Sequence, residues 1–436
     1  MVNLSRFILA VVFIFSGYVK AIDPLGTQYK IQDYLSALGW GNIFPDVVIL
    51  CLSVALSAFE FCLGIMLLFA IQRRMISKLV TAFLVVMTIV TLWIVITNPI
   101  SDCGCFGDAI ILTNTQTFLK NIVLLLLSII VLLWPLRMKR LISKTNQWIV
   151  TNYTILFILS CSIYSLYVLP VFDFRPYHIG ADIKEGMSIP PDAPQPKFET
   201  TFIMEKDGVQ KEFSLENYPD STWTFVDSKT VQTEKGFVPP IHDFVIELNG
   251  EEDITEQVLN DPKYTLLLIS PHLENADDSN FGVIDQIYEY AQEKGVSFYC
   301  LTASTEKARK RWQDLTGAEY PFCLTDEITL KTMIRSNPGL MLLKQGVVMW
   351  KWSHNTLPDV EELDTMIKDI DKGEVPKDSA PEKIIFIILW FILPLVLLTL
   401  ADRTWAWTKW LRKKESNHKI FKRLKDNKDE KENCSR

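Results

Sequence analysis

The sequence has few of the residues and patterns that mark several common functional classes. Only eight of its 436 residues are cysteine, which excludes a small domain stapled by many disulfides. Its formal net charge is −7, so a nucleic-acid partner is not expected. It contains no P-loop and no dinucleotide-binding glycine pattern, and no feature marks a hydrolase or a kinase.

Apolar residues are abundant instead, and they are clustered. They make up 49% of the chain and give a mean hydropathy of +0.17, whereas 22% of the residues are charged. This combination indicates a protein with both membrane and soluble parts. Each of six apolar runs is long enough to cross a bilayer core, which takes roughly 20 helical residues. We therefore expect a multi-pass helical membrane bundle with spans at 4–22, 47–71, 79–97, 118–136, 148–172 and 384–401. A signal peptide is the alternative for the first run, but Lys20 gives it a poor cleavage context.

Basic residues follow the second, fourth and sixth runs, and the other short loops contain few. Cytoplasmic loops are enriched in Lys and Arg, so we expect a bacterial inner-membrane protein with both termini in the cytoplasm. Residues 402–436 then form a basic cytoplasmic tail. Residues 173–383 are periplasmic, as is the loop between the third and fourth spans, on a side where disulfides persist. The basic residues are Arg73, Arg74, Lys78, Arg137, Lys139, Arg140, Lys144 and several after Lys409.

The large outer segment predicts a linker followed by an α/β domain. Residues 173–235 indicate a linker with a β-hairpin, and residues 236–380 alternate strands and helices before a final hairpin and helix. This order, with Asn337-Pro338 just before the hairpin, resembles the thioredoxin fold; another α/β sandwich is the alternative. The resemblance implies that Pro338 is a cis-proline facing the active site, which the small energetic preference of X–Pro bonds permits.

The thioredoxin family's chemistry needs a C-x-x-C motif after the first strand, and this sequence lacks it. No cysteine occurs between Cys161 and Cys300, and the matching positions contain His272 and Glu274. We interpret these two residues as surface residues of a retained loop, with a catalytic role as the weaker alternative. Cys300 and Cys323 fall in predicted strands, where free cysteine is a common core residue. The domain is therefore not expected to exchange dithiols by the family's route.

The loop between the third and fourth spans carries the residues with the clearest chemical potential. It reads Asp102-Cys103-Gly104-Cys105-Phe106-Gly107-Asp108. Two thiols separated by one glycine close only a small, strained ring, and strained disulfides exchange readily. Asp102 and Asp108 are expected to raise the thiol pKa values by like-charge repulsion. The equal alternative is that both are outward-facing caps, with Asp108 capping the next short segment. Three interpretations stay open: redox exchange by Cys103 and Cys105, a structural disulfide, and a metal site. The metal site is the least favoured, because C-x-C gives only two ligands.

Residues 1–140 resemble the MauE branch of the DoxX-like membrane proteins. The CGCFG loop carries the most specific match, and the segments Phe15–Lys20 with Asp23-Pro24 and Glu60–Gly64 add moderate ones. The resemblance implies a role in maturing a periplasmic methylamine dehydrogenase, alongside a separate thioredoxin-like partner. The chain looks like a fusion of the two modules. The missing C-x-x-C puts the partner's dithiol activity in doubt, and the substrate need not carry over.

Glu60 is an acidic residue inside a predicted span, and intramembrane carboxylates indicate function by default. Lys20, near the outer end of the first span, is a candidate ion-pair partner. The alternatives for Glu60 are a neutral hydrogen-bonded carboxyl, a proton carrier and a contact to a quinone headgroup. Cys51 is a candidate resolving thiol for the loop, or a small packing residue.

Two functional hypotheses follow from these features. In the first, Cys103 and Cys105 relay electrons between a periplasmic client or redox partner and a membrane carrier, for which a quinone is the candidate cofactor. In the second, the protein is a non-catalytic scaffold whose redox-silent domain binds a periplasmic client while the bundle anchors it. No metal is expected in either.

Overall fold

The structure is a computed structural model. The chain divides into two compact units that are described separately. The first unit comprises Met1–Arg175, Trp352–Leu357 and Lys377–Arg436, and the second comprises Pro176–Lys351 and Pro358–Pro376. The described residues are 1–41, 43–100, 102–194, 197–206, 209–214, 223–234, 236–242, 244–373 and 380–434.

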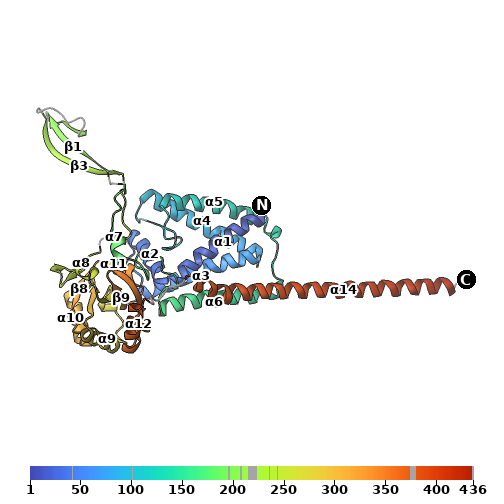
Figure 1. Ribbon diagram of the computed structural model, residues 1–436. Helices are drawn as coiled ribbons and strands as arrows, with labels where there is room; N and C mark the ends of the chain where they lie inside the picture. Colours follow the sequence, from blue (N-terminus) through green and yellow to red (C-terminus); the bar gives the residue numbers. More distant parts are fainter. Residues whose placement is uncertain are drawn as a thin grey trace. The chain divides into compact units, whose positions relative to one another are not determined.

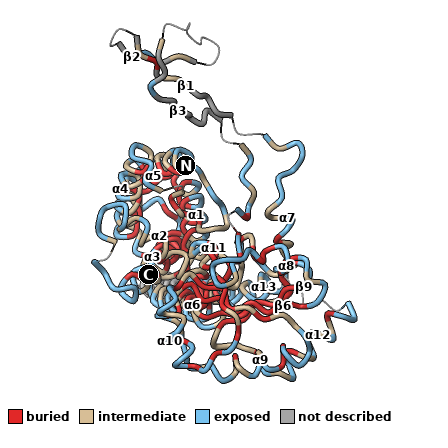
Figure 2. Tube along the Cα trace, turned by 90° about the vertical axis from the view of Figure 1, so that its left-hand side faces the viewer, coloured by how far each residue is buried: buried red, intermediate tan, exposed pale blue. Residues whose placement is uncertain are grey.

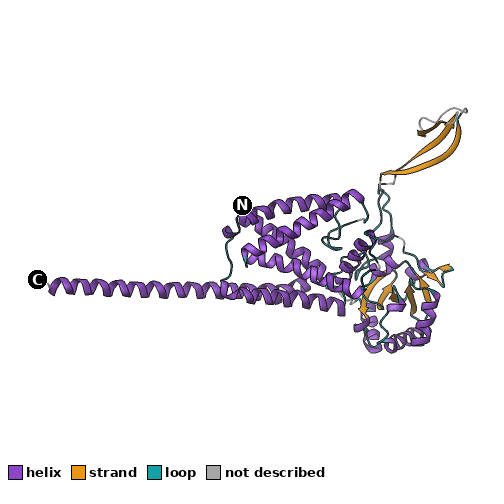
Figure 3. Cartoon of the chain, turned by 180° about the vertical axis from the view of Figure 1, so that it is seen from behind, coloured by secondary structure: helices purple, strands orange, loops and turns teal. Residues whose placement is uncertain are grey.

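The first unit is built almost entirely of helices (Figures 1 and 3). Within the described residues, six helical segments are long and apolar enough to cross a membrane, which confirms the six predicted spans. The last segment contains a π-helical turn at Ile388–Ile392, just before Pro394, where the missing proline N–H loosens the helical hydrogen bonding. The helices are α1 Val2–Ile22, α2 Pro24–Ala37, α3 Asp46–Phe69, α4 Arg73–Thr97, α5 Asn114–Leu133, α6 Gln147–Tyr167, α13 Ala380–Ile387 and α14 Leu393–Cys434.

Large apolar side chains are exposed along the outer sides of these helices, whereas buried residues line their inner sides (Figure 2). In water, such large exposed apolar surfaces would be unfavourable, but hydrocarbon solvates them. The backbone polar groups are satisfied within each helix, as a bilayer core requires. The outward faces of α4 and α5 are therefore lipid-facing, and they include Val86, Ile89, Ile96, Leu126 and Ile129.

Helices α1 and α3 approach each other closely through two glycines. A Cβ atom added to Gly17 would lie 2.4 Å from the Phe61 nitrogen, and one added to Gly64 would lie 2.7 Å from the Ile14 nitrogen. Real Cβ atoms are not found this near to backbone, so both positions need glycine for the helices to meet. Small residues are the usual means of close helix approach in membranes. Two of the segments that resemble MauE thus serve helix packing.

The basic stretches gather at one end of the bundle. Arg73 donates hydrogen bonds to the carbonyl oxygens of Leu136 (2.7 Å) and Met138 (2.8 Å). The Asp402 carboxylate, beside the last span, accepts a hydrogen bond from the Ser143 nitrogen at 2.7 Å. Because α4 begins at Arg73 and ends at Thr97, the loop with the two cysteines lies at the opposite end of the bundle. The basic tail continues as helix α14 to Cys434.

Helix α2 is an element that the sequence analysis did not predict. Asp23 caps it by accepting a hydrogen bond from the Gly26 nitrogen at 2.9 Å, and Pro24 occupies its first position. It is too short and too polar to span a bilayer. It packs on α1 and α3 and stands beside the cysteine loop.

The second unit contains a mixed sheet of order β10-β9-β6-β7-β8-β4-β5. Strand β6 is parallel to β7 and antiparallel to β9, and every residue of β6 is buried (Figure 2). This core confirms the predicted α/β, thioredoxin-like order of elements. The strands are β4 Glu247–Leu248, β5 Glu252–Asp253, β6 Tyr264–Ser270, β7 Ser297–Thr302, β8 Phe322–Leu324, β9 Gly339–Lys344 and β10 Val347–Ser353. The helices are α7 Ile183–Met187, α8 Thr255–Leu259, α9 Phe281–Lys294, α10 Glu306–Thr316, α11 Glu327–Met333 and α12 Val360–Asp371. The Asn337–Pro338 peptide bond is cis, as expected.

A separate three-stranded sheet occupies the predicted linker region. Strand β1 (Lys197–Lys206) pairs antiparallel with both β2 (Val209–Ser214) and β3 (Thr224–Glu234). The predicted hairpin corresponds to β1 and β2; its turn, at 207–208, lies outside the described residues, as does Pro196 of the linker. Strand β3 was missed because its sequence is mostly polar and lacks a strong alternation of apolar residues.

The close approach of α1 and α3 predicts the effect of enlarging Gly64. Gly64→Leu should lower the thermal midpoint of the purified protein in detergent, because overpacking of this kind costs about 1–3 kcal/mol. The matched control is Gly282→Ala in α9, where no atom lies within 4 Å of the added Cβ. A Gly64→Leu protein that melts with the wild type would contradict the described packing.

Candidate functional site

The cysteine loop connects α4 to α5 and is shaped by residues with special backbone geometry. Asn98 ends α4 in the left-handed conformation, and Thr113 begins α5 with a capping box to Gln116. Gly104 and Gly107 have φ values of +64° and +53°, which side-chain-bearing residues rarely adopt. These two glycines turn the chain so that the cysteines face inward. Asp108 is half-buried in this turn and does not cap α5.

The two loop cysteines are free thiols in contact. Their sulfur atoms lie 3.2 Å apart, and the residues are 6% and 9% exposed. An S–S bond measures about 2.05 Å, so the pair would have to approach by roughly 1.2 Å to close it. Apolar side chains of α4, including Ile94 and Val90, pack against them. The arrangement is a buried dithiol, and a small movement of the loop would bring the two sulfur atoms to the distance of a disulfide bond.

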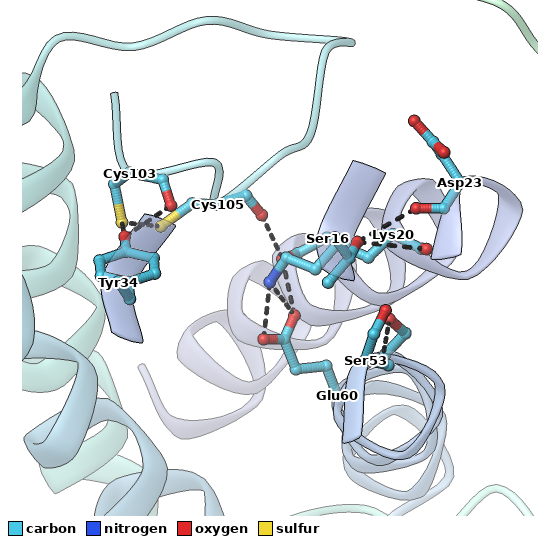
Figure 4. A network of polar contacts seen from close by, with 10 residues as sticks. Ser16, Lys20, Asp23, Tyr34, Ser53, Glu60, Cys103 and Cys105 are labelled. Atoms are coloured by element: carbon cyan, nitrogen blue, oxygen red, sulfur yellow. Dashed lines mark hydrogen bonds and ion pairs between the residues drawn. The ribbon is translucent and has the colours of Figure 1, made fainter. Parts of the chain in front are cut away.

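Helix α2 holds the Cys103 side of the loop. The Tyr34 hydroxyl lies 2.8 Å from the Cys103 carbonyl oxygen and 3.2 Å from its sulfur (Figure 4). One turn earlier, the Lys30 ammonium pairs with Asp102 at 2.8 Å, and Asp102 also accepts a hydrogen bond from the Gly104 nitrogen. Lys30 and Tyr34 are four residues apart and therefore share one face of the helix. In the sequence, the Asp23-Pro24 helix start followed by Lys30 and Tyr34 at i,i+4 spacing was the signal that could have predicted this helix face.

A buried polar network holds the Cys105 side. Lys20 and Glu60 form an ion pair with nitrogen–oxygen distances of 2.8 and 2.9 Å, and the residues are 6% and 2% exposed. The expected pairing of these residues is therefore confirmed. The Ser16 hydroxyl lies 2.8 Å from a Glu60 oxygen and 2.7 Å from the Cys105 carbonyl oxygen (Figure 4). Its one hydrogen can serve only one of these acceptors at a time.

The hydrogen bond between the two thiols, together with two nearby lysines, gives the thiols unequal acidities. The Cys103 thiol donates a hydrogen bond to Cys105, and the Lys120 and Lys20 ammonium groups face it, which together lower the pKa of Cys105 to about 6. The same hydrogen bond, together with burial, raises the pKa of Cys103. The expectation of a raised thiol pKa is wrong for Cys105, because the hydrogen bond from Cys103 and the Lys120 and Lys20 cations lower its pKa. The negative charge of Asp102 is, moreover, paired with the Lys30 ammonium group.

A pocket that is open on one side borders Cys105. Its wall is formed by α1, α3, α4, α5 and the loop. The polar groups at its surface are Ser16, Lys20, Glu60, Lys120 and Asn121. Lys120 is a site residue that the sequence analysis missed, because a lysine near the start of a span reads as an ordinary interfacial residue.

The roles predicted for two further site residues, Cys51 and Asp108, stay predictions. Cys51 is exposed on α3, whereas both loop thiols are buried, so its role as a resolving thiol stays a prediction. A functional role for Asp108 stays a prediction as well. In the described part of the chain, no group of three or more His, Cys, Asp or Glu residues is arranged to hold a metal ion.

The second unit has a hydrogen-bonded network in the loop that follows β6. The Asn337 side chain bridges Ser270 Oγ (2.6 Å) and the His272 carbonyl oxygen (2.9 Å). Glu274 accepts a hydrogen bond from Ser304 at 2.6 Å, and this bond lowers its pKa. These contacts make the loop rigid but supply no nucleophile.

The strand cysteines of this unit are core residues. Cys300 and Cys323 have no exposed surface. Burial raises the pKa of Cys300 and raises that of Cys323 to about 12, so both stay protonated thiols at neutral pH. Reactive thiols need the opposite environment, so redox work by either residue is disfavoured.

Comparisons with known proteins link the first unit to one family. The family described as "Methylamine utilisation protein MauE" matches residues 1–135, and that described as "Domain of unknown function (DUF8463)" matches residues 198–235. No curated protein matches the chain. The N-terminal part is thus similar to MauE membrane proteins, in agreement with the CGCFG resemblance.

Three of the solved structures that are similar to the chain each cover less than a third of it. A proposed protein disulfide isomerase from Bacteroides thetaiotaomicron shares 14% identity over 30% of this chain and 85% of its own, with a TM-score of 0.24. An uncharacterised conserved protein from Geobacillus kaustophilus shares 13% over 31% and 82%, with a TM-score of 0.24. The bacterioferritin comigratory protein of Xanthomonas campestris shares 10% over 30% and 92%, with a TM-score of 0.22. At these values, the similarities assign no function.

The unequal acidities predict a pH-dependent alkylation pattern. In reduced protein, the rate of Cys105 alkylation by iodoacetamide should rise through a midpoint near pH 6, because its pKa is lowered to about 6 and the thiolate is the reactive form. In Cys103→Ala, the midpoint should move upward, since the donated hydrogen bond is lost. Peptide mass spectrometry over a pH series measures both. A midpoint near the ordinary value of about 8.5 in the wild type would contradict the described environment.

Proposed function

We propose that this protein exchanges thiols and disulfides at a membrane surface, with Cys103 and Cys105 as the working pair. The observation that carries the proposal is the contact between two buried thiols, 3.2 Å apart, with cations facing one of them. A structural pair would gain nothing from a lowered pKa at Cys105. An exchanging pair gains both a ready nucleophile and a good leaving group.

The difference in acidity between Cys103 and Cys105 suggests the order of the thiol–disulfide exchange steps. In the oxidised protein, a client thiolate attacks the Cys103 sulfur, and the S–S bond breaks with its electron pair leaving on Cys105. The low pKa of Cys105 favours its departure as thiolate. A second client thiol then attacks the mixed disulfide and releases Cys103, which takes up a proton. The client loses two electrons and becomes a disulfide, and the loop becomes the dithiol of this structure.

For the location, we propose a bacterial inner membrane with both termini in the cytoplasm. Its support is the gathering of the basic stretches at one bundle end, opposite the cysteine loop. Residues 173–383 and the loop would then share the periplasm, where thiol oxidation occurs. Protein maturation there fits the similarity to MauE proteins, and the proposal names no methylamine-related substrate.

For the α/β domain, we propose client binding without electron transfer. Its hydrogen-bonded loop at His272 and its buried strand cysteines leave it without a dithiol. The same observations favour a second candidate function, in which the whole protein is a scaffold and the loop cysteines are static. The two candidates differ in whether the redox state of Cys103 and Cys105 can change.

The first experiment asks whether the loop pair cycles. The purified full chain is placed in glutathione redox buffers, and the oxidised fraction of the loop peptide is measured by differential alkylation and mass spectrometry. We expect the Cys103–Cys105 disulfide to form and disappear reversibly as the buffer changes, and Cys105→Ala to abolish this. Cys51→Ser, the matched control, should behave as the wild type. A pair that keeps one state in all buffers would favour the scaffold.

The second experiment asks on which side of the membrane the loop lies. Alkaline phosphatase, which needs disulfides to fold, should be active when fused after Thr113 and inactive when fused after Ser143. The reason is that the cysteine loop is expected outside and the basic end inside. The reverse pattern of activity would refute the proposed orientation. Fusion abundance, measured by immunoblot, is the control.

A further inference from the structure

The pocket beside Cys105 lies at membrane depth. Apart from Cys105 and Phe106, its lining residues belong to the membrane-spanning helices α1, α3, α4 and α5. A water-soluble protein substrate therefore does not enter it.

The walls of the pocket are largely aromatic and apolar. Phe13, Phe83 and Phe106 contribute three aromatic rings, and Phe13 and Phe83 pack edge-on with centroids 5.5 Å apart. Met87 and Leu124 add apolar side chains. Aromatic side chains bind planar rings favourably by stacking or edge-to-face contact. Such a lining selects a flat, lipid-soluble molecule.

Two polar residues of the pocket, Lys120 and Asn121, come from α5. The Lys120 ammonium lies 4.2 Å above the centre of the Phe106 ring. Among the described residues, no carboxylate forms an ion pair with it. Asn121, 3% exposed, is held by its hydrogen bond to Thr91 at 3.2 Å. An unneutralised ammonium donor beside a reactive thiol favours a ligand that carries an oxygen acceptor and becomes negative on reduction.

We propose that this pocket binds a quinone headgroup, which accepts the electrons of the Cys103–Cys105 pair. The inference rests on the thiol-exchange function proposed above and names the oxidant that regenerates the disulfide. Lys120 donates a hydrogen bond to one quinone oxygen, the aromatic side chains enclose the ring, and the isoprenoid tail extends into the bilayer.

The reaction balances with the quinone as the stated oxidant. Cys103 and Cys105 lose two electrons and two protons in total and form one S–S bond. The quinone takes up both electrons and two protons and leaves as the quinol. One proton comes from the Cys103 thiol, and the second replaces, from solvent, the proton that Cys105 released on becoming a thiolate. The chain then holds the disulfide that a client can reduce.

A pocket-filling substitution separates this proposal from the one it rests on. Met87→Trp puts an indole ring into the pocket. The matched control, Val86→Trp, puts the same ring at the neighbouring position, where the native side chain is 58% exposed. Reduced full-length protein in lipid nanodiscs is mixed anaerobically with ubiquinone-1 or, separately, with glutathione disulfide. Quinol absorbance and alkylation mass spectrometry follow the two oxidations, and thermal midpoints confirm that the variants are folded.

In the wild type, we expect one quinone to be reduced per protein, with matching loss of the Cys103 and Cys105 thiols. The ratio of the quinone rate to the glutathione-disulfide rate should fall at least tenfold in Met87→Trp and stay unchanged in Val86→Trp. If glutathione disulfide oxidises the wild-type pair but ubiquinone-1 does not, the quinone site is refuted and the thiol-exchange function stands. If neither oxidises the pair, both proposals fall. An equal fall of the ratio in both variants would also refute the site.

Discussion

The buried ion pair between Lys20 and Glu60 is the interaction on which the arrangement of the site depends. Two charges taken into a low-dielectric bundle lose several kcal/mol of solvation each, and only a well-formed pair with further hydrogen bonds compensates for this. The pair joins α1 to α3 at the point where Gly17 lets the two backbones meet. Through Ser16, it also reaches the Cys105 carbonyl oxygen, so helix packing and loop position are fixed together.

The two sulfurs differ in acidity first because of the hydrogen bond that they share, which lowers the pKa of Cys105 and raises that of Cys103. Cys103 meets the Tyr34 hydroxyl from α2, a neutral partner. Cys105 faces the ammonium groups of Lys20 and Lys120 from α1 and α5. Of two identical thiols two residues apart, Cys105 therefore has a lowered pKa and Cys103 a raised one. Such a division suits exchange chemistry, which needs a good leaving group and a thiol that holds the intermediate.

The α/β unit shows that a fold can persist without the residues that give it its usual chemistry. Its sheet order and its cis Asn337–Pro338 bond are in place, and a side-chain network around Asn337 holds the loop that follows β6. The thiols that remain in it, Cys300 and Cys323, are buried and weakly acidic. The residues with redox potential in this chain therefore lie in the membrane loop, and the fold of the α/β unit does not by itself indicate a function.

The six spans, the α/β order of elements, the two loop cysteines and Lys20 as a partner for Glu60 could all be predicted from the sequence. Long apolar runs, strand–helix periodicity and a charge inside a span are local signals, and local signals can be read one segment at a time. Only the tertiary structure decided that Lys120 and Tyr34 reach the loop and that Cys105 is the acidic thiol. These facts depend on which helix faces stand together, and the electrostatic environment of a thiol is set by charges that lie far away in the sequence.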